Sequence, residues 1–274
     1  MDADIQVKDF DMRRFCSKHG ATCIILGARG RGKSTMIMDI LYNLHHISRV
    51  PRAVVFSGTE KANGTYSKFG IPARYIFDSY DADALQTIYN MQEKLTEDKR
   101  KGIIDESIDT RMVIVFDDCG FDEKMFKTAL MRKLFMNGRH YGIYVIIALQ
   151  YHMSIGPTIR TQIDFFIATR WDVKTQRKQI YTHYASVYDH FDTFNDVMEA
   201  ATINRRCIIV DNTTDSSDPQ DKLFSYKARY GRRCFFGSPE YRQYARIGSG
   251  RLEQMAKAVN TGAGMKRRVK IKTS

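Results

Sequence analysis

One short glycine-rich segment limits what this chain can fold into more than any other feature. Residues 27–34 read G-A-R-G-R-G-K-S, directly after an apolar run that ends at Leu26 and before an apolar pattern of helical spacing that begins at Ile37. A strand, a glycine-rich turn and a helix in this order point backbone N–H groups and the positive end of a helix dipole into one concavity. Triphosphate oxygens fit such a concavity, so the segment predicts a nucleotide-binding α/β domain.

The parts of this segment have distinct expected roles in holding ATP and Mg²⁺. Lys33 is expected to reach the β- and γ-phosphates, and the Ser34 hydroxyl to bind Mg²⁺. Gly27 and Gly32 are expected where the backbone approaches the phosphates and a Cβ would intrude. The predicted nucleotide-binding residues are Gly27, Ala28, Arg29, Gly30, Arg31, Gly32, Lys33, Ser34 and Thr35.

Strand and helix signals alternate along the rest of the chain. Apolar runs typical of buried strands occupy residues 52–57, 73–77, 112–116, 144–149, 163–169 and 206–210. Helical patterns lie at 83–102, 123–136 and 175–198, and a capping-box-like pair, Asp83 and Gln86, is expected to open the first of these. The alternation predicts an α/β fold with a mostly parallel, doubly wound sheet.

Charge divides the chain into unequal parts. The net charge is +12, and residues 227–274 contain 13 Lys or Arg against two acidic residues, so nearly all of the excess lies there. A basic C-terminal segment on a nearly neutral body indicates a polyanionic partner, or else a solvated surface with a frayed end. We expect a lead-in at 1–20, a nucleotide-binding core at 21–225, a basic aromatic lobe at 226–260 and a disordered basic tail at 261–274.

Aromatic and basic residues are interleaved in that C-terminal lobe. The aromatic set is Tyr226, Tyr230, Phe235, Phe236, Tyr241 and Tyr244, and the arginines are Arg229, Arg232, Arg233, Arg242 and Arg246. This mixture suits a nucleic-acid surface, with arginines on phosphates and rings on bases or sugars. It equally suits an ordinary small lobe.

Composition also indicates the cellular compartment and whether the sequence contains a metal-binding motif. No apolar stretch approaches the roughly 20 residues that span a bilayer, and the acidic N-terminus lacks a signal-peptide core, so a cytosol-like compartment and no membrane span are expected. The five cysteines form no C-x-x-C pair, and the seven histidines show no metal-binding spacing. Reduced thiols and ordinary surface or core histidines are therefore expected.

Two acids and an amide are candidates for the hydrolytic chemistry. An apolar run ends in Asp117 and Asp118, and Gln150 ends the next predicted strand. Open α/β sheets place ligands at the carboxyl ends of their strands. Asp117 is expected to hold Mg²⁺, Asp118 to act as general base on the attacking water, and Gln150 to lie beside the γ-phosphate.

Three arginines are candidates for stabilising charge on the transferring phosphoryl group. Arg29 and Arg31 lie in the phosphate loop and could act within one subunit. Arg139 follows the helix-ending Gly138 and is expected to face away from its own nucleotide. We favour Arg139 as a finger that enters a neighbouring subunit's site.

These motifs resemble those of the FtsK–HerA superfamily of DNA-pumping ATPases, and most closely the genome-packaging ATPases of poxviruses and other nucleocytoplasmic large DNA viruses. The resemblance covers about residues 20–212 and rests on the phosphate loop, V-I-V-F-D-D, N-G-R-H-Y-G-I-Y-V-I-I-A-L-Q and I-G-P-T-I-R-T-Q-I-D-F-F-I-A-T-R. It implies a RecA-like P-loop core, a homo-oligomeric ring with nucleotide at subunit seams, and duplex DNA through the centre. Gln150 matches the sensor position and Arg139 the Gly-Arg position, while Asp118 stands where many members have Glu.

The resulting hypothesis is an ATP-driven motor that moves double-stranded viral DNA, without reading its sequence, into a capsid. Capsid or packaging-vertex proteins are then partners, and the host cytoplasm at viral assembly sites, or the virion itself, is the location. Three alternatives are a helicase or DNA-segregation pump, a P-loop kinase acting on a metabolite, and a DNA-binding protein with a vestigial nucleotide site. Intact Lys33, Ser34 and Asp117 argue against the last.

Overall fold

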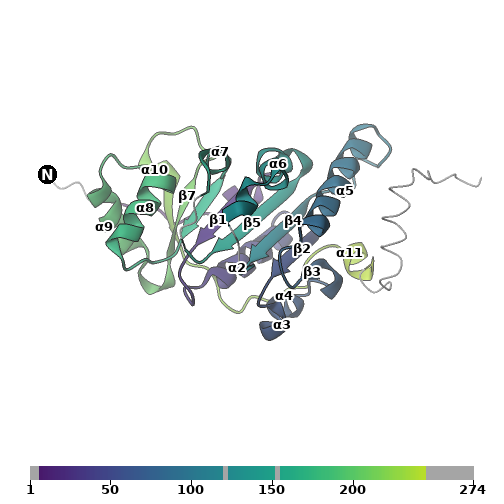
Figure 1. Cartoon of the computed structure of the whole chain (residues 1–274), viewed down its shortest axis with the longest axis horizontal. Coiled ribbons are helices and arrows are strands. Elements are labelled where there is room, and N and C mark those ends of the chain that lie inside the picture. Colours follow the sequence, from purple (N-terminus) through teal and green to yellow (C-terminus); the bar gives the residue numbers. More distant parts are fainter. Residues whose placement is uncertain (1–5, 120–122, 152–154, 245–274) are drawn as a thin grey trace, which may run out of the picture.

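An eight-stranded sheet forms the centre of the computed structural model, which describes residues 6–119, 123–151 and 155–244 (Figure 1). The strand order across the sheet is β3-β2-β4-β5-β1-β6-β7-β8. The strands are β1 (Thr22–Leu26), β2 (Arg52–Ser57), β3 (Ile76–Phe77), β4 (Met112–Asp117), β5 (Ile143–Leu149), β6 (Phe165–Ala168), β7 (Cys207–Asp211) and β8 (Leu223–Tyr226).

Helices and short 3-10 turns connect these strands. The α-helices are α1 (Arg13–Cys16), α2 (Lys33–His46), α3 (Glu60–Asn63), α4 (Thr65–Lys68), α5 (Ala82–Arg100), α6 (Ala129–Asn137), α7 (Pro157–Arg160), α8 (Lys174–Tyr184), α9 (Phe191–Ala201), α10 (Pro219–Lys222) and α11 (Pro239–Tyr244). The 3-10 turns are η1 (Ala73–Tyr75), η2 (Glu123–Lys127), η3 (Gly138–Tyr141) and η4 (Ile203–Arg205). Among the described residues, no helix is both long and apolar enough to cross a membrane.

The first six strands in the spatial order, from β3 to β6, are parallel to one another. β1, which precedes the phosphate loop, pairs with β5 on one side and β6 on the other. Helices cover both faces of the sheet (Figure 1). The expected mostly parallel, doubly wound α/β fold is therefore confirmed, and the carboxyl ends of β1, β4 and β5 meet at one edge.

The end of the sheet near the C-terminus departs from the parallel pattern. β7 runs antiparallel to β6, and β8, which the sequence did not predict, runs antiparallel to β7. The expected helix at 175–198 is in fact two helices, α8 and α9, which pack on each other. A pair of helices returns the chain to the sheet edge it left, so the next strand must run in the opposite direction.

Other element boundaries also differ from the sequence predictions. The segment 123–136 divides into η2 and α6, because Thr128 caps a new helix by accepting from the Met131 N–H. Helix α5 begins at Ala82, with Asp81 and not Asp83 as its cap, since the Asp81 carboxylate accepts from the Ala84 N–H. Strand 73–77 shrinks to β3 after a 3-10 turn.

Two apolar layers sandwich the sheet because successive residues of a strand point to opposite faces. Ile24 and Leu26 of β1 pack toward α5, α6, α8 and α9. Cys23 and Ile25 pack toward α2, the lead-in and the C-terminal segment. Strands buried on both faces hold their carboxyl ends rigidly, which suits them to position a site.

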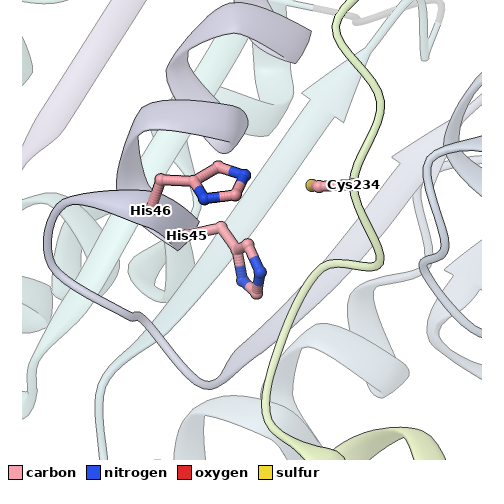
Figure 2. A group of neighbouring side chains, drawn as sticks. All are labelled: His45, His46 and Cys234. Carbon is pink, nitrogen blue, oxygen red and sulfur yellow. The ribbon is translucent and has the colours of Figure 1, made fainter.

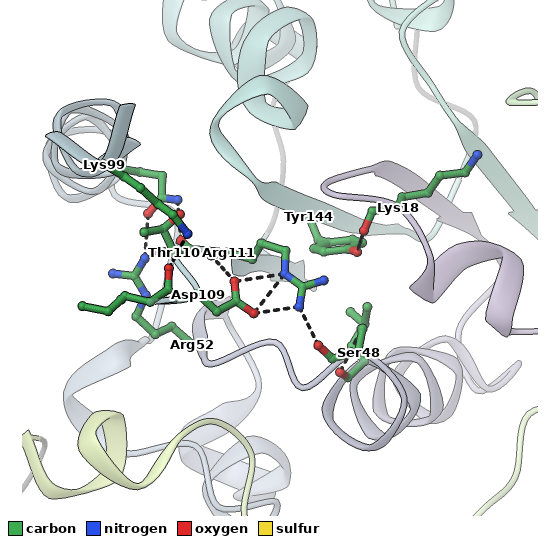
Figure 3. A network of polar contacts seen from close by, with 11 residues as sticks. Lys18, Ser48, Arg52, Lys99, Asp109, Thr110, Arg111 and Tyr144 are labelled. Atoms are coloured by element: carbon green, nitrogen blue, oxygen red, sulfur yellow. Dashed lines mark hydrogen bonds and ion pairs between the residues drawn. The ribbon is translucent and has the colours of Figure 1, made fainter. Parts of the chain in front are cut away.

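A polar network ties the sheet together at its amino edge (Figure 3). Arg111, just before β4, pairs with Asp109 at 2.7 Å and donates to the Ser48 carbonyl at the α2–β2 connection. Arg52 of β2 donates to the Thr110 carbonyl at 2.6 Å. Burial alone would raise the pKa of Asp109, but hydrogen bonds from Arg111 hold that pKa below its usual value. These contacts fix β2 and β4 relative to the phosphate-loop helix.

Residues 227–244, which we call the C-terminal strap, lie on the α2 side of the sheet. Phe236 and Tyr241 are buried there, at 0% and 5% exposure, and Phe236 belongs to the same apolar cluster as α2. Arg232 pairs at 2.8 Å with Asp39 of α2, whose carboxylate is fully buried. The described part of the expected 226–260 lobe thus packs on the core; residues 245–260 and the expected tail 261–274 lie outside the described residues.

Candidate active site

The phosphate loop joins β1 to α2 and forms an open turn. Gly30 and Gly32 have φ values of +74° and +86°, which favour glycine, and a Cβ at either would meet nothing within 4 Å. Gly27 differs, because a Cβ there would lie 2.3 Å from the Thr169 hydroxyl oxygen. Close packing against the chain after β6 therefore requires glycine at position 27, a reason that the sequence did not reveal, and the expected approach of phosphates to Gly27 stays a prediction.

Lys33 begins α2 and folds back over the loop. Its Nζ donates to the carbonyl oxygens of Gly27 at 2.8 Å and Ala28 at 3.1 Å. Burial lowers the pKa of Lys33, while the charges of Asp117 and Asp118 oppose that shift. The ammonium is thus held at the mouth of the turn, where exchanging two carbonyl acceptors for phosphate oxygens is a small movement.

Asp117 ends β4 with its carboxylate facing Ser34. The Ser34 hydroxyl donates to Asp117 Oδ2 at 3.0 Å. Burial raises the pKa of Asp117, and the hydrogen bonds from Tyr66 and Ser34 counter that rise. A hydroxyl and a carboxylate side by side match the oxygen ligands that Mg²⁺ uses next to phosphates, so the two residues predicted to bind the metal do lie together.

Asp118 and Gln150 also meet at this edge. The Gln150 Nε2 donates to Asp118 Oδ1, although the two residues belong to different strand ends. Asp118 has φ +52°, an unusual conformation for a non-glycine residue. Its carbonyl oxygen would lie 2.4 Å from a Cβ on Gly58, so the adjacent turn needs glycine for this conformation to fit. The predicted base and the predicted sensor are therefore in direct contact.

The three candidate arginines lie in different parts of the structure. Arg31 pairs at 2.6 Å with Asp172, beyond β6, and Arg29 is exposed on the loop. Arg139 lies in η3 before β5, half exposed, with its Nη1 3.6 Å from Asp164 Oδ1, just before β6. Strands β5 and β6 begin at the amino edge, so Arg139 lies at the edge opposite the phosphate loop.

Tyr66 is a site residue that the sequence did not reveal. It is fully buried in α4, and its hydroxyl donates to Asp117 Oδ2 at 2.8 Å. The Glu60 carboxylate fixes α4 by accepting from the backbone N–H groups of Tyr66 and Ser67 at 2.9 Å. No motif precedes or follows Tyr66, and only the fold brings this segment under the carboxyl end of β4.

A hollow of about 150 Å³ opens beside the end of β1. It is lined by Leu26, Tyr151, Trp171, Gln176, Gln179 and Ile180. The indole N–H of Trp171 is buried and has no hydrogen-bond partner within the described part of the chain. An aromatic wall with one unpaired donor and nearby amides is suited to a flat, polar-edged ring.

The aromatic and basic residues near the C-terminus divide into two sets. Phe236, Tyr241 and Arg232 pack on the core, and Tyr226 donates to Asp39 at 2.6 Å, so these are structural. A second set faces solvent, with Tyr230 and Phe235 exposed by 90% and 75%. This exposed set is Lys227, Arg229, Tyr230, Arg233 and Phe235. The interpretation as an ordinary lobe therefore holds for the buried set, and a nucleic-acid surface stays a prediction for the exposed set.

The chain matches one protein family and is similar to several viral proteins. Residues 8–224 match the model of the family described as the poxvirus A32 protein. The chain is 35% identical over 228 residues to protein 015R of Frog virus 3, covering 82% of this chain and 68% of that protein. It is 34% identical over 229 residues to protein 088R of Invertebrate iridescent virus 3, covering 82% and 84% respectively.

Solved structures share the fold at low sequence identity. The genome-packaging NTPase B204 from Sulfolobus turreted icosahedral virus 2, in complex with AMP, matches with a TM-score of 0.55 and 15% identity, covering 77% of this chain and 99% of that one. The pCW3 conjugation coupling protein TcpA with ATPγS matches with a TM-score of 0.52 and 16% identity, covering 83% and 66%. The fold is thus that of P-loop ATPases.

Proposed function

The chain belongs to the poxvirus A32 protein family, and on that premise we propose that this P-loop ATPase drives double-stranded viral DNA into a capsid during virion assembly. Family membership agrees with the resemblance to packaging ATPases of large DNA viruses that the motifs indicated. Three parts of this function go beyond family membership: translocation of DNA, duplex DNA as the substrate, and the capsid as its destination.

One observation carries the proposal more than any other. The candidate residues come from three segments that are distant in the sequence: the start of α2 (Lys33, Ser34), the end of β4 (Asp117, Asp118) and the end of β5 (Gln150). Hydrogen bonds nevertheless join Ser34 to Asp117 and Gln150 to Asp118 at one edge of the sheet. A phosphate cradle, a metal-binding pair and a paired base and amide are the parts that anhydride hydrolysis requires.

The chain's own groups have separable roles in this hydrolysis. Ser34 and Asp117 would hold Mg²⁺, which supplies charge neutralisation on the phosphate oxygens. Asp118 accepts the proton of the attacking water, and Gln150, bonded to Asp118, orients that carboxylate and the water. When nucleotide binds, the Lys33 ammonium exchanges its hydrogen bonds to the Gly27 and Ala28 carbonyl oxygens for contacts with phosphate oxygens.

We place Arg139 in a neighbouring subunit's site. Its position at the sheet edge opposite the phosphate loop keeps it away from its own nucleotide, and its half-exposed side chain forms a long 3.6 Å ion pair with Asp164. A homo-oligomeric ring would bring that edge against the next subunit's phosphate loop. An arginine finger raises turnover by roughly 10³–10⁵.

The exposed set Lys227, Arg229, Tyr230, Arg233 and Phe235 is our candidate for contacting the DNA backbone. Together with the basic residues beyond 244, it would bind phosphates without reading bases. Capsid or packaging-vertex proteins would be further partners, at viral assembly sites in the host cytoplasm or in the virion.

The decisive experiment measures ATP hydrolysis against duplex DNA concentration, together with particle mass with and without nucleotide. We expect duplex of any sequence to raise turnover and nucleotide to favour a ring; Lys33→Ala abolishes hydrolysis. A monomer whose turnover ignores DNA contradicts the motor. Strand separation without any capsid partner would favour the helicase alternative, and phosphate transfer to a metabolite the kinase alternative.

Salt dependence tests the DNA surface separately. Each phosphate contact contributes about 0.9 to the slope of log affinity against log salt. Arg229→Ala with Arg233→Ala is expected to reduce that slope by about 2 for all duplex sequences. Lys94→Ala with Arg100→Ala, which removes the same charge from exposed positions on α5, is the matched control and should leave the slope nearly unchanged.

A further inference from the structure

Two histidines and a cysteine converge where α2 ends. His45 and His46 occupy the last turn of α2, and Cys234 belongs to the C-terminal strap that crosses it. One ligand atom from each residue lies within 4.8 Å of the others. Figure 2 shows both imidazole rings on the side of the helix that faces the segment carrying Cys234. Sequence spacing gave no sign of this cluster, because the strap comes late in the chain.

We propose that His45, His46 and Cys234 form a binding site for a zinc-type divalent metal ion that fastens the C-terminal strap to the phosphate-loop helix.

The ligand chemistry selects the metal class. Two imidazole nitrogens and one thiolate suit Zn²⁺, whereas Mg²⁺ and Ca²⁺ require oxygen ligands. Zinc–nitrogen and zinc–sulfur bonds of about 2.0 and 2.3 Å place tetrahedral ligand atoms roughly 3.3–3.6 Å apart. Small side-chain rotations would bring the three ligand atoms from separations within 4.8 Å into this range. His46 is exposed, so an ion can enter from solvent and water can take the fourth position.

Two opposing electrostatic effects act at this place. Burial and the charges of His46, Arg242 and Arg49 lower the pKa of His45, and these positive charges oppose a bound cation, whereas the end of α2 attracts one. The C-terminal end of a helix carries negative partial charge from its unpaired carbonyl groups, and α2 ends at His46. Metal binding displaces the thiol proton of Cys234 to solvent, so the site gains an anionic ligand when it is filled. The His45 Nδ1 accepts a long 3.3 Å hydrogen bond from the Gly237 N–H. The ring must release this bond when it binds a metal, a small loss beside a metal–ligand bond.

The test uses the full chain and titrates Zn²⁺ and Co²⁺ separately. We expect one ion per chain, a thiolate-to-cobalt charge-transfer band in the near ultraviolet, and a higher Tm with zinc. Cys234→Ser is expected to abolish the band, and either Cys234→Ser or His46→Ala to weaken zinc binding at least tenfold. His140→Ala, which removes an exposed histidine that is not part of the cluster, is the matched control.

The proposal is overturned if cobalt gives no thiolate band, or if Cys234→Ser and His46→Ala bind zinc as tightly as the unchanged chain. Retained ATP binding in both variants establishes that they are folded, so a loss of zinc binding is attributable to the missing ligand. These measurements need neither DNA nor hydrolysis, and their outcome is independent of the motor function.

Discussion

The hydroxyl of Tyr66 donates a 2.8 Å hydrogen bond to Oδ2 of Asp117, the same oxygen that accepts from Ser34. A buried phenol therefore orients the carboxylate expected to hold Mg²⁺. Tyr66 is expected to act through the Asp117 carboxylate, so we assign it as a positioning residue. This relationship links the short helix α4 to the chemistry at the end of β4.

Tyr66→Phe removes only that hydroxyl. Because the hydrogen bond from Tyr66 lowers the pKa of Asp117, its loss raises that pKa, and the acid limb of Mg²⁺-dependent hydrolysis should move to higher pH. Direct titration of the metal should show the same shift in its pH dependence. Tyr241→Phe, which removes another buried hydroxyl bonded to the Ala53 carbonyl, should cost about 1 kcal/mol of stability and leave the pH limb in place. Equal pH profiles for both variants would contradict the role of Tyr66.

Asp117→Asn should separate stability from function. Burial raises the pKa of Asp117 in the folded chain, so the proton binds more tightly there than in the unfolded chain. Ionising the carboxyl therefore costs stability above that raised pKa, and the cost disappears as pH falls toward 3.8. The variant should melt at a higher temperature than the unchanged chain at pH 7, with the difference closing in acid, while Mg²⁺ binding is lost. A lower Tm at pH 7 would be the contrary result.

Mixing two inactive variants tests the shared site. Arg139→Ala leaves the phosphate loop intact, and Lys33→Ala leaves the arginine intact. If Arg139 acts on a neighbour, mixed rings contain some seams with both groups, so hydrolysis should return to a substantial fraction of the unchanged rate. Arg139→Ala alone should bind nucleotide normally and lose roughly 10³-fold or more in turnover. No recovery on mixing, in rings of confirmed mixed composition, would place the finger elsewhere.

Trp171 offers a direct probe of nucleotide binding, because it is the chain's one tryptophan and lines the hollow beside β1. We expect this hollow to receive the base of ATP, so the fluorescence of Trp171 should change when ATP binds, even without DNA. Gln176→Ala with Gln179→Ala should weaken discrimination between ATP and GTP by about tenfold, since amides read the edge of a base. Lys178→Ala, on the exposed side of the same helix, is the control. Fluorescence that is indifferent to saturating ATP would exclude the hollow as the base site.

Arg232 should be important for stability without touching the nucleotide. It pairs with the fully buried Asp39 and lies 4.0 Å from the centre of the Tyr42 ring. Arg232→Ala leaves the buried Asp39 carboxylate with its hydrogen bond from Tyr226 but without a neutralising cation, and should cost about 3 kcal/mol, lowering Tm on the order of 10 °C by thermal unfolding. Lys101→Ala breaks an exposed pair on α5 and should cost under about 0.5 kcal/mol. Similar losses of stability in the two variants would mean that the C-terminal strap contributes little to the stability of the fold.

The sequence by itself was enough to predict the residues of the candidate site and to determine the main architecture. A strand, a glycine-rich turn and a helix are local patterns, and buried parallel strands read as continuous apolar runs, so Lys33, Ser34, Asp117 and Gln150 could be assigned to one sheet edge. The interleaved residues near the C-terminus could not be sorted, because burial of Phe236 and exposure of Phe235 depend on which side of the strap meets α2.

The tertiary structure alone decided the contacts between segments that carry no motif. Tyr66 reaches Asp117, Thr169 imposes glycine at Gly27, and Cys234 meets His45 and His46, in each case because sheet order and helix packing bring distant segments together. The direction of β7 was likewise invisible, since the break between α8 and α9 contains neither glycine nor proline. Local sequence patterns indicate which chemistry a side chain can perform. The packing of the sheet and its helices determines which other residues that side chain contacts.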